Sequence, residues 1–138
     1  MTGTPAPPAL TGGLFDLLGL EMPEASGDRV VVRWTVGPEH LQPVGLLHGG
    51  VHCAVVETAA SVGAALWLGD RGSVVGVSNS TDFFRAAREG TALTATAAPL
   101  HRGRSQQVWA VEVVDEHGRR VARGQVRLQN LDGADRAG

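Results

Sequence analysis

The sequence contains several short segments in which apolar and polar residues alternate, the pattern of strands that bury one face. The first predicted strand is the β-branched segment 28–36, which ends at a Gly-Pro pair. The same reasoning predicts four further strands in the second half of the chain, at 73–84, 91–100, 107–115 and 120–130. Most of these strands are joined by short turns, so the pattern predicts an antiparallel sheet.

One apolar stretch is much longer than any of these strands, and it predicts a helix. It runs from Val51 to Leu68, follows two glycines and ends near Gly69. A short amphipathic helix, closed by glycine, is predicted earlier in the chain at 13–19. One long helix together with five or six strands predicts an α+β domain in which an antiparallel sheet covers a central helix.

Length and composition indicate one folded domain. The chain has 138 residues, of which 43% are hydrophobic and 19% are charged, enough for a single core. We expect this domain to span residues 10–131. The segments 1–9 and 132–138 are rich in small or polar residues and are predicted to be disordered tails.

Charge and cysteine content narrow the functional classes. The net charge of −2 argues against a nucleic-acid binder, which needs a basic surface. Cys53 is the only cysteine, so no internal disulfide forms, and the N-terminus has neither the basic nor the apolar region of a signal peptide. The long apolar stretch is near membrane-spanning length, but Glu57, His52 and its small residues favour a helix buried in protein. We therefore expect a cytoplasmic protein that binds neither membrane nor nucleic acid.

Glu57 is the only acidic residue in the long apolar stretch, and it is the first candidate for chemistry. Burial of an isolated carboxylate costs on the order of several kcal/mol, and a chain retains such a group more readily for function than for packing. The stretch follows His48, Gly49 and Gly50, whose backbone N–H groups at a helix N-terminus can receive an anion. A carboxylate close to such donors predicts acyl chemistry.

Together these residues resemble the hallmark of hotdog-fold acyl-CoA thioesterases. The similarity covers about residues 41–126 and rests on the segment 42–50, Glu57 and Ser61, the segment 78–85, and the segment 102–105. It is greatest to the phenylacetate-pathway thioesterases and, within that group, the glutamate-type 4-hydroxybenzoyl-CoA thioesterases. The resemblance implies a curved sheet wrapped around the central helix. It also implies a homo-oligomer, a dimer or a dimer of dimers (homotetramer), with active sites at the subunit interface.

The resemblance further implies a role for each residue of the motif. The Gly49 N–H group donates to the oxyanion, and Glu57, two turns further along, either attacks the thioester or activates a water. Gln42 matches a family position that contacts the thioester or the water. Ser61 matches a family Thr or Ser that holds the water, and His48 has a supporting role. Gly49 and Glu57 are expected to converge on one thioester carbonyl.

Coenzyme A presents phosphates, and arginine binds phosphate better than lysine because it can donate two parallel hydrogen bonds. The candidates for this contact are Arg85, Arg88, Arg104 and Ser105. The benzoyl-CoA enzymes tend to carry small hydroxyl residues where this chain has Arg104 beside Ser105, so here the chain departs from the family pattern. The expected substrate is an acyl-CoA, and aromatic acyl groups are favoured by similarity alone.

Other interpretations stay open at this point. Glu57 can be a structural carboxylate paired with an arginine, and the chain can be a non-catalytic acyl-CoA-binding module of the same fold. A hydratase of this fold needs an Asp/His pair in a different motif. No His-Glu-x-x-His pattern, nucleotide-binding glycine pattern or serine-hydrolase elbow occurs in the sequence, so neither a metal nor a cofactor is expected.

Overall fold

The structure of the protein, a computed structural model, describes residues 10–133. Its elements are α1 (Leu14–Leu17), β1 (Glu21–Ala25), β2 (Val30–Thr35), α2 (Gly49–Leu68), β3 (Gly72–Phe83), β4 (Ala92–Arg102), β5 (Gln106–Asp115) and β6 (Arg120–Asp132), with 3-10 turns at Pro38–His40 and Gly69–Arg71. The predicted tail 1–9 lies outside the described residues, as do residues 134–138 of the second predicted tail. Strand β6 includes Asp132, so the ordered sheet extends one residue beyond the predicted domain end.

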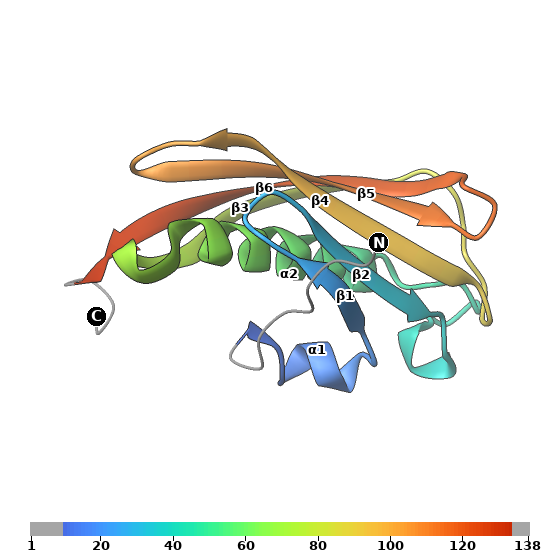
Figure 1. Cartoon of the computed structure of the whole chain (residues 1–138). Helices are drawn as coiled ribbons and strands as arrows, with labels where there is room; N and C mark the ends of the chain where they lie inside the picture. Colours follow the sequence, from blue (N-terminus) through green and yellow to red (C-terminus); the bar gives the residue numbers. More distant parts are fainter. Residues whose placement is uncertain (1–9, 134–138) are drawn as a thin grey trace.

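The six strands form one antiparallel sheet in the order β1-β2-β4-β5-β6-β3, which places β1 and β3 at its two edges. Figure 1 shows this sheet lying over one side of α2, with α1 on the other side. The predicted α+β architecture, an antiparallel sheet around one central helix, is confirmed.

The edge strand β1 was not predicted from the sequence. Its residues, Glu-Met-Pro-Glu-Ala, include no β-branched side chain and contain Pro23. A strand tolerates proline at a sheet edge, where the missing N–H group breaks no ladder hydrogen bond. The pairing of β1 with β2 is irregular between Glu21 and Glu24. Its strand conformation therefore comes from the neighbouring β2 and not from local preference.

A close contact at Gly63 joins α2 to the middle of the sheet. Trp109 of β5 is fully buried beneath this glycine, and a Cβ atom at Gly63 would lie 2.5 Å from its ring. The indole Nε1 donates to Gln107 Oε1 at 2.9 Å, and Gln107 Nε2 donates to the carbonyl of Ala64 at 3.2 Å and to Asn130 Oδ1 at 2.9 Å. The buried polar atoms are thus paired, and they tie the helix to β5 and β6.

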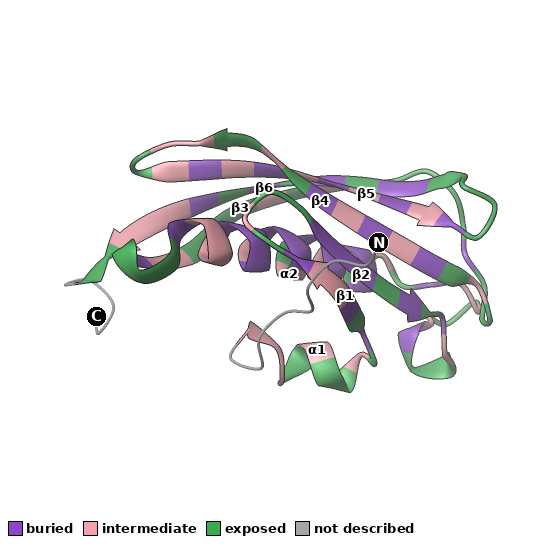
Figure 2. Cartoon of the chain, in the orientation of Figure 1, coloured by how far each residue is buried: buried purple, intermediate pink, exposed green. Residues whose placement is uncertain are grey.

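Strand β3 is the less covered of the two edges. Val75 and Val77 are 44% and 54% exposed, and Figure 2 shows bands of buried and less buried residues alternating along the long strands. The pairing of β3 with β6 shifts between Gly76 and Ser78, so a β-bulge interrupts the strand at this point. Bulges bend a strand and change the direction of its side chains. This bulge lies beside Glu57, as described below.

Candidate active site

Helix α2 begins at Gly49 because the preceding residue caps it. The backbone of His48 is extended, with φ −66° and ψ 131°, and its Nδ1 accepts a hydrogen bond from Gly50 N–H at 2.7 Å. The His48 carbonyl accepts from Val51 N–H at 3.0 Å. These two bonds leave Gly49 N–H without a hydrogen-bond partner among residues 10–133. The free donor therefore stands at the positive end of the helix dipole.

Gly49 is packed closely under an aromatic ring. A Cβ atom at this position would lie 2.6 Å from two ring atoms of Phe83, so glycine gives the room for this contact. Gly49 lines a cavity of about 280 Å³ together with Gln42, His52, Phe83 and Arg85. The predicted oxyanion donor and the predicted thioester contact thus border the same space.

Gln42 closes the loop that precedes α2. Its Oε1 atom accepts hydrogen bonds from Val44 N–H at 2.6 Å and from Leu46 N–H at 3.4 Å. The amide nitrogen of Gln42 takes part in no hydrogen bond within the described part of the chain. The loop geometry is therefore fixed by the side-chain oxygen, and the two N–H donors are left for a ligand.

Glu57 is exposed in this chain, so the prediction that it is buried is wrong. The sheet covers only one side of α2, and Glu57 lies on the uncovered side. Asn79 of β3 orients the carboxylate: its Nδ2 donates to Glu57 Oε1 at 3.3 Å and to the Cys53 carbonyl at 3.1 Å, and its Oδ1 accepts from Thr81 Oγ1 at 2.7 Å. No ion pair to Glu57 occurs among residues 10–133, which argues against a structural carboxylate held by arginine.

Gly76 of β3 gives the Glu57 carboxylate its space. A Cβ atom at Gly76 would lie 2.7 Å from Glu57 Oε2, and Gly76 is the residue at which the β3 bulge begins. Neither Gly76 nor Asn79 was predicted to act in the site. A glycine inside a strand often marks a bulge or a close approach, and asparagine is rare in strands, so both signals were present in the sequence.

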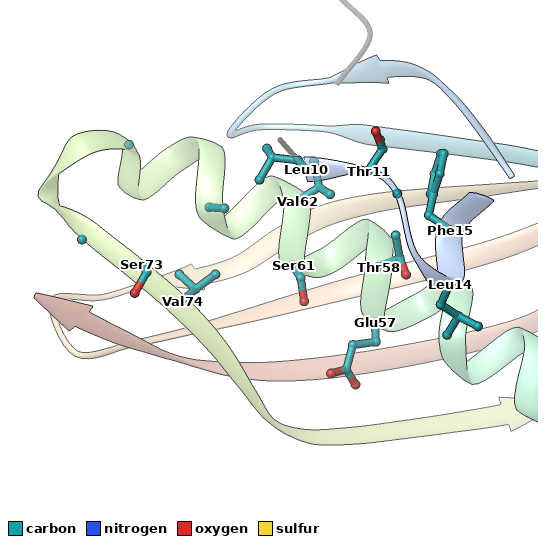
Figure 3. A pocket seen from close by; sticks show the side chains of 14 residues that line it. Leu10, Thr11, Leu14, Phe15, Glu57, Thr58, Ser61, Val62, Ser73 and Val74 are labelled. Atoms are coloured by element: carbon teal, nitrogen blue, oxygen red, sulfur yellow. The ribbon is translucent and has the colours of Figure 1, made fainter. Parts of the chain in front are cut away.

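Ser61 follows Glu57 by one helical turn and shares its surroundings. Both residues line a cavity of about 660 Å³, together with Thr58, Val74 and the N-terminal segment around Phe15. Figure 3 shows the Glu57 and Ser61 side chains extending from α2 toward β3.

The single chain does not bring the two halves of the predicted site together. Gly49 lines the cavity of about 280 Å³ with Gln42, whereas Glu57 and Ser61 line the cavity of about 660 Å³. Eight residues along one helix correspond to about 12 Å along its axis. One thioester carbonyl cannot contact Gly49 N–H and Glu57 of the same chain across that distance, so the expected convergence does not occur within one chain.

The four candidate CoA contacts also fall into separate places. Arg85 is exposed and lines the cavity of about 280 Å³. Arg88 is exposed and sits in the segment that follows β3. Arg104 and Ser105 line a third cavity, of about 360 Å³, beside Trp67 at the other end of α2. Within one chain, Arg85 and Arg104 therefore do not border a common space.

Comparison with known proteins places this geometry in a family. The family described as Thioesterase superfamily matches residues 44–122. The crystal structure of AziG from S. sahachiroi aligns with a TM-score of 0.85 at 60% identity, covering 88% of this chain and 98% of AziG. The proofreading thioesterase EntH of Cronobacter turicensis is 37% identical over 109 residues, 79% of each chain. The 1,4-dihydroxy-2-naphthoyl-CoA hydrolase of Listeria monocytogenes is 36% identical over 104 residues, 75% of this chain and 84% of the relative.

The family match includes most of the candidate site residues described above. It spans more than half of the chain and contains Gly49, Glu57 and Ser61, while Gln42 lies just before it. The TM-score of 0.85 to AziG shows that the two chains share their overall fold. The chain belongs to the hotdog-fold thioesterase superfamily and is a thioester hydrolase.

Proposed function

We propose that the protein hydrolyses acyl-CoA thioesters, aromatic acyl-CoAs in particular, with Glu57 as nucleophile or general base and Gly49 N–H as the oxyanion donor. One observation carries this proposal. A helix N-terminus keeps an unpaired N–H group at Gly49, and the same helix presents a carboxylate held by the amide of Asn79 and by no cation within the described residues. A donor and a carboxylate of this kind are the two groups that acyl transfer to water needs.

The chemistry follows in one of two ways. As a general base, Glu57 removes a proton from water while the water oxygen bonds to the thioester carbon. The carbonyl oxygen becomes negative and accepts a hydrogen bond from Gly49 N–H. The C–S bond then breaks to release the acid, and the leaving CoA thiolate takes the proton that Glu57 holds. As a nucleophile, the Glu57 oxygen bonds to the same carbon, CoA leaves as a thiolate that takes a proton from water, and water cleaves the resulting anhydride.

Three neighbouring residues support this chemistry. The Ser61 hydroxyl extends from α2 on the same side as Glu57 and can hold the attacking water (Figure 3). The amide nitrogen of Gln42 can donate to the substrate, since its oxygen is already bound by the loop. His48 occupies Gly50 N–H and so leaves Gly49 as the free donor. We assign His48 a positioning role.

A second copy of the chain completes the site in this proposal. At about 100° per residue, Gly49, Cys53 and Glu57 fall within about 80° of the circumference of α2. A second α2 that packs antiparallel across this face places its Glu57 opposite Gly49, and two-fold symmetry gives the reverse contact as well. The symmetry axis then passes near Cys53, midway between the two. Each dimer has two sites, and each site takes one half from each chain.

Two surfaces of the chain are suited to such a partner. The uncovered face of α2 carries small, half-buried residues around Glu57, namely Cys53, Ala54, Thr58, Ser61 and Ala65. Small side chains allow two helices to approach closely. The adjoining strand β3 has an unpaired edge with Val75 and Val77 exposed, and an open edge of this kind pairs readily with another strand. A homodimer, alone or within a dimer of dimers, covers both surfaces.

The proposed substrate class rests on side-chain chemistry and on one relative. Arg85 borders the Gly49 cavity, and Arg104 with Ser105 borders another, so guanidinium groups are available for the phosphates of CoA. Arg88 is the fourth candidate, from the segment after β3. The Listeria relative is named for an aromatic CoA ester. Phe83 in the Gly49 cavity offers a flat apolar surface for an aromatic acyl group.

Substitution of Glu57 tests the proposal. Glu57→Gln keeps the size of the side chain and removes both the base and the nucleophile, so we expect the kcat for benzoyl-CoA to fall by about 10²–10⁴-fold. The rate is measured by release of free CoA thiol. Glu21→Gln, in β1 at the opposite edge of the sheet, is the matched control and should keep the parental rate. A Glu57→Gln protein that works at the parental rate would rule out both roles for this carboxylate.

A further inference from the structure

The chain buries two histidines, and they differ in how their ring nitrogens are satisfied. His40 is 2% exposed; its Nδ1 accepts from Gly37 N–H at 2.9 Å and its Nε2 lies 2.7 Å from the Leu18 carbonyl. His52 is 3% exposed, yet neither of its ring nitrogens has a hydrogen bond among residues 10–133, and Nδ1 is sealed from solvent. The hydrogen bonds of His40 explain why a histidine is buried at that position, and His52 has no such bonds.

The surroundings of His52 are aromatic and keep it neutral. Phe83 stacks on the imidazole with ring centroids 5.7 Å apart and planes at 26°, and Trp34 meets it edge to face at 6.2 Å and 75°. Trp34 Nε1 is likewise buried and unpaired in the described chain. Burial lowers the pKa of His52 to about 4, so the ring is uncharged at neutral pH. An apolar side chain would fill the same space without leaving a buried polar nitrogen unpaired.

His52 borders the space where the acyl group of the proposed substrate lies. It lines the cavity of about 280 Å³ together with Gly49, and it follows Gly49 by three residues, about 4.5 Å along the helix axis. An acyl group whose carbonyl oxygen is held by Gly49 N–H can therefore reach the imidazole within this cavity. A cavity of about 150 Å³ is enough for benzene, so this one accommodates a substituted ring.

We propose that His52 is a specificity-determining residue, whose Nε2 atom, the ring nitrogen that is not sealed from solvent, hydrogen-bonds a hydroxyl group on the acyl part of the substrate. This inference rests on the proposed thioesterase function. A hydroxyl group both donates and accepts, so it satisfies either tautomer of a neutral imidazole, whereas an anionic substituent gains no charge partner from it. The flanking rings of Phe83 and Trp34 favour a flat acyl group beside the hydroxyl. The site therefore favours hydroxylated over unsubstituted acyl thioesters of the same size.

Discrimination between matched esters tests the assignment. We expect wild-type protein to favour at least one of 2-, 3- and 4-hydroxybenzoyl-CoA over benzoyl-CoA by about tenfold or more in kcat/KM, because an unmet polar group in a binding site disfavours the analogue that lacks the partner. His52→Leu should lower this ratio to within about threefold, by slowing the hydroxylated ester and not benzoyl-CoA. His52→Asn keeps a donor and an acceptor and should retain part of the preference. His117→Leu, in the β5–β6 turn, is the matched control.

The thermal stability of the variants separates a role of His52 in substrate specificity from a role in holding the fold. His52→Leu removes an unpaired buried nitrogen, so its thermal midpoint should equal or exceed that of wild type. A wild type that hydrolyses all four esters equally well would overturn the inference. A hydroxyl preference that is unchanged in His52→Leu would also overturn it. If the leucine variant does not fold, a hydroxyl preference as large in His52→Asn as in wild type would overturn it.

If the proposed function is wrong, the result differs from that expected if only the role of His52 is wrong. If wild type hydrolyses none of the four esters, calorimetric binding of the same esters to wild type decides the matter. About tenfold tighter binding of a hydroxylated ester supports the role of His52 without hydrolysis, and equal affinities contradict it.

Discussion

At the scale of single residues, Asn79 holds the carboxylate that the reaction needs. One amide nitrogen bridges Glu57 Oε1 and the Cys53 carbonyl, and the amide oxygen is itself fixed by Thr81. The side chain therefore has a defined orientation before substrate arrives. A carboxylate on an exposed helix face otherwise samples several rotamers. Asn79 acts through Glu57 and is a positioning residue.

Replacement of Asn79 should lower turnover more than substrate binding. In Asn79→Ala the donor to Glu57 is lost, and we expect kcat to fall by roughly tenfold to a hundredfold, the equivalent of one hydrogen bond to a charged group, with KM nearly unchanged. Asn79→Ser keeps a short donor and should recover part of the rate. Ser80→Ala, the next residue along β3 and exposed, is the control. A rise in KM of roughly tenfold to a hundredfold with unchanged kcat would instead mean that Asn79 contacts the substrate.

The residues of the site differ in how far the sequence could reveal them. Gly49, Glu57 and Ser61 share one helix, so the motif and its spacing were enough to select them. Asn79 meets Glu57 across 22 positions, a contact that exists only because β3 packs beside α2. The exposure of Glu57 was mispredicted for a related reason. An apolar stretch shows that a helix is buried, but not which of its faces the sheet leaves uncovered.

At the scale of elements, the packing of α2 on the sheet depends on the absence of a side chain at Gly63. Glycine inside a helix is normally replaced by alanine with a gain of roughly 1 kcal/mol. Here a Cβ atom would lie 2.5 Å from the fully buried ring of Trp109, and that ring is further held through its Nε1 by Gln107. Because the indole is fully buried and held at Nε1, packing opposes the intrinsic preference of the helix for alanine.

We therefore expect Gly63→Ala to lower the free energy of unfolding by about 1–3 kcal/mol, the usual cost of overpacking a core. The measurement is equilibrium denaturation in urea, with the slope checked for a change in two-state behaviour. The same substitution in a Trp109→Phe background, where the ring is smaller, should cost clearly less, and the difference is the coupling energy of the pair. A stabilised single variant would show that the Gly63 contact is not a constraint.

The elements themselves were largely predictable because their patterns are local. The helix and most of strands β2 to β6 carry either apolar runs or alternation, which depend only on neighbouring residues. Strand β1 lacks both, since it is short, contains Pro23 and takes its conformation from β2. The bulge in β3 was also missed, although Gly76 marks its position. Both omissions are edge features, whose shape comes from packing and not from periodicity.

At the scale of the whole molecule, the proposed site is divided between chains, and this division can be tested without a structure of the dimer. Gly49 is the first residue of α2, a position where proline is well tolerated because its missing N–H has no helical partner. The preceding residue, His48, already has the extended backbone that proline requires. Phe83, 54% exposed, can turn away from the new ring. Gly49→Pro thus removes the oxyanion donor with little effect on the helix.

Mixing two inactive variants should then restore activity. Gly49→Pro and Glu57→Gln are each expected to be nearly inactive, but a mixed dimer has one site with Gly49 from one chain and Glu57 from the other. Half of randomly assorted dimers are mixed and each has one intact site of two, so a refolded equal mixture should recover about a quarter of the parental rate. The rate is measured by thiol release from benzoyl-CoA, and each variant refolded alone is the control. A mixture no more active than its components would contradict the two-fold arrangement.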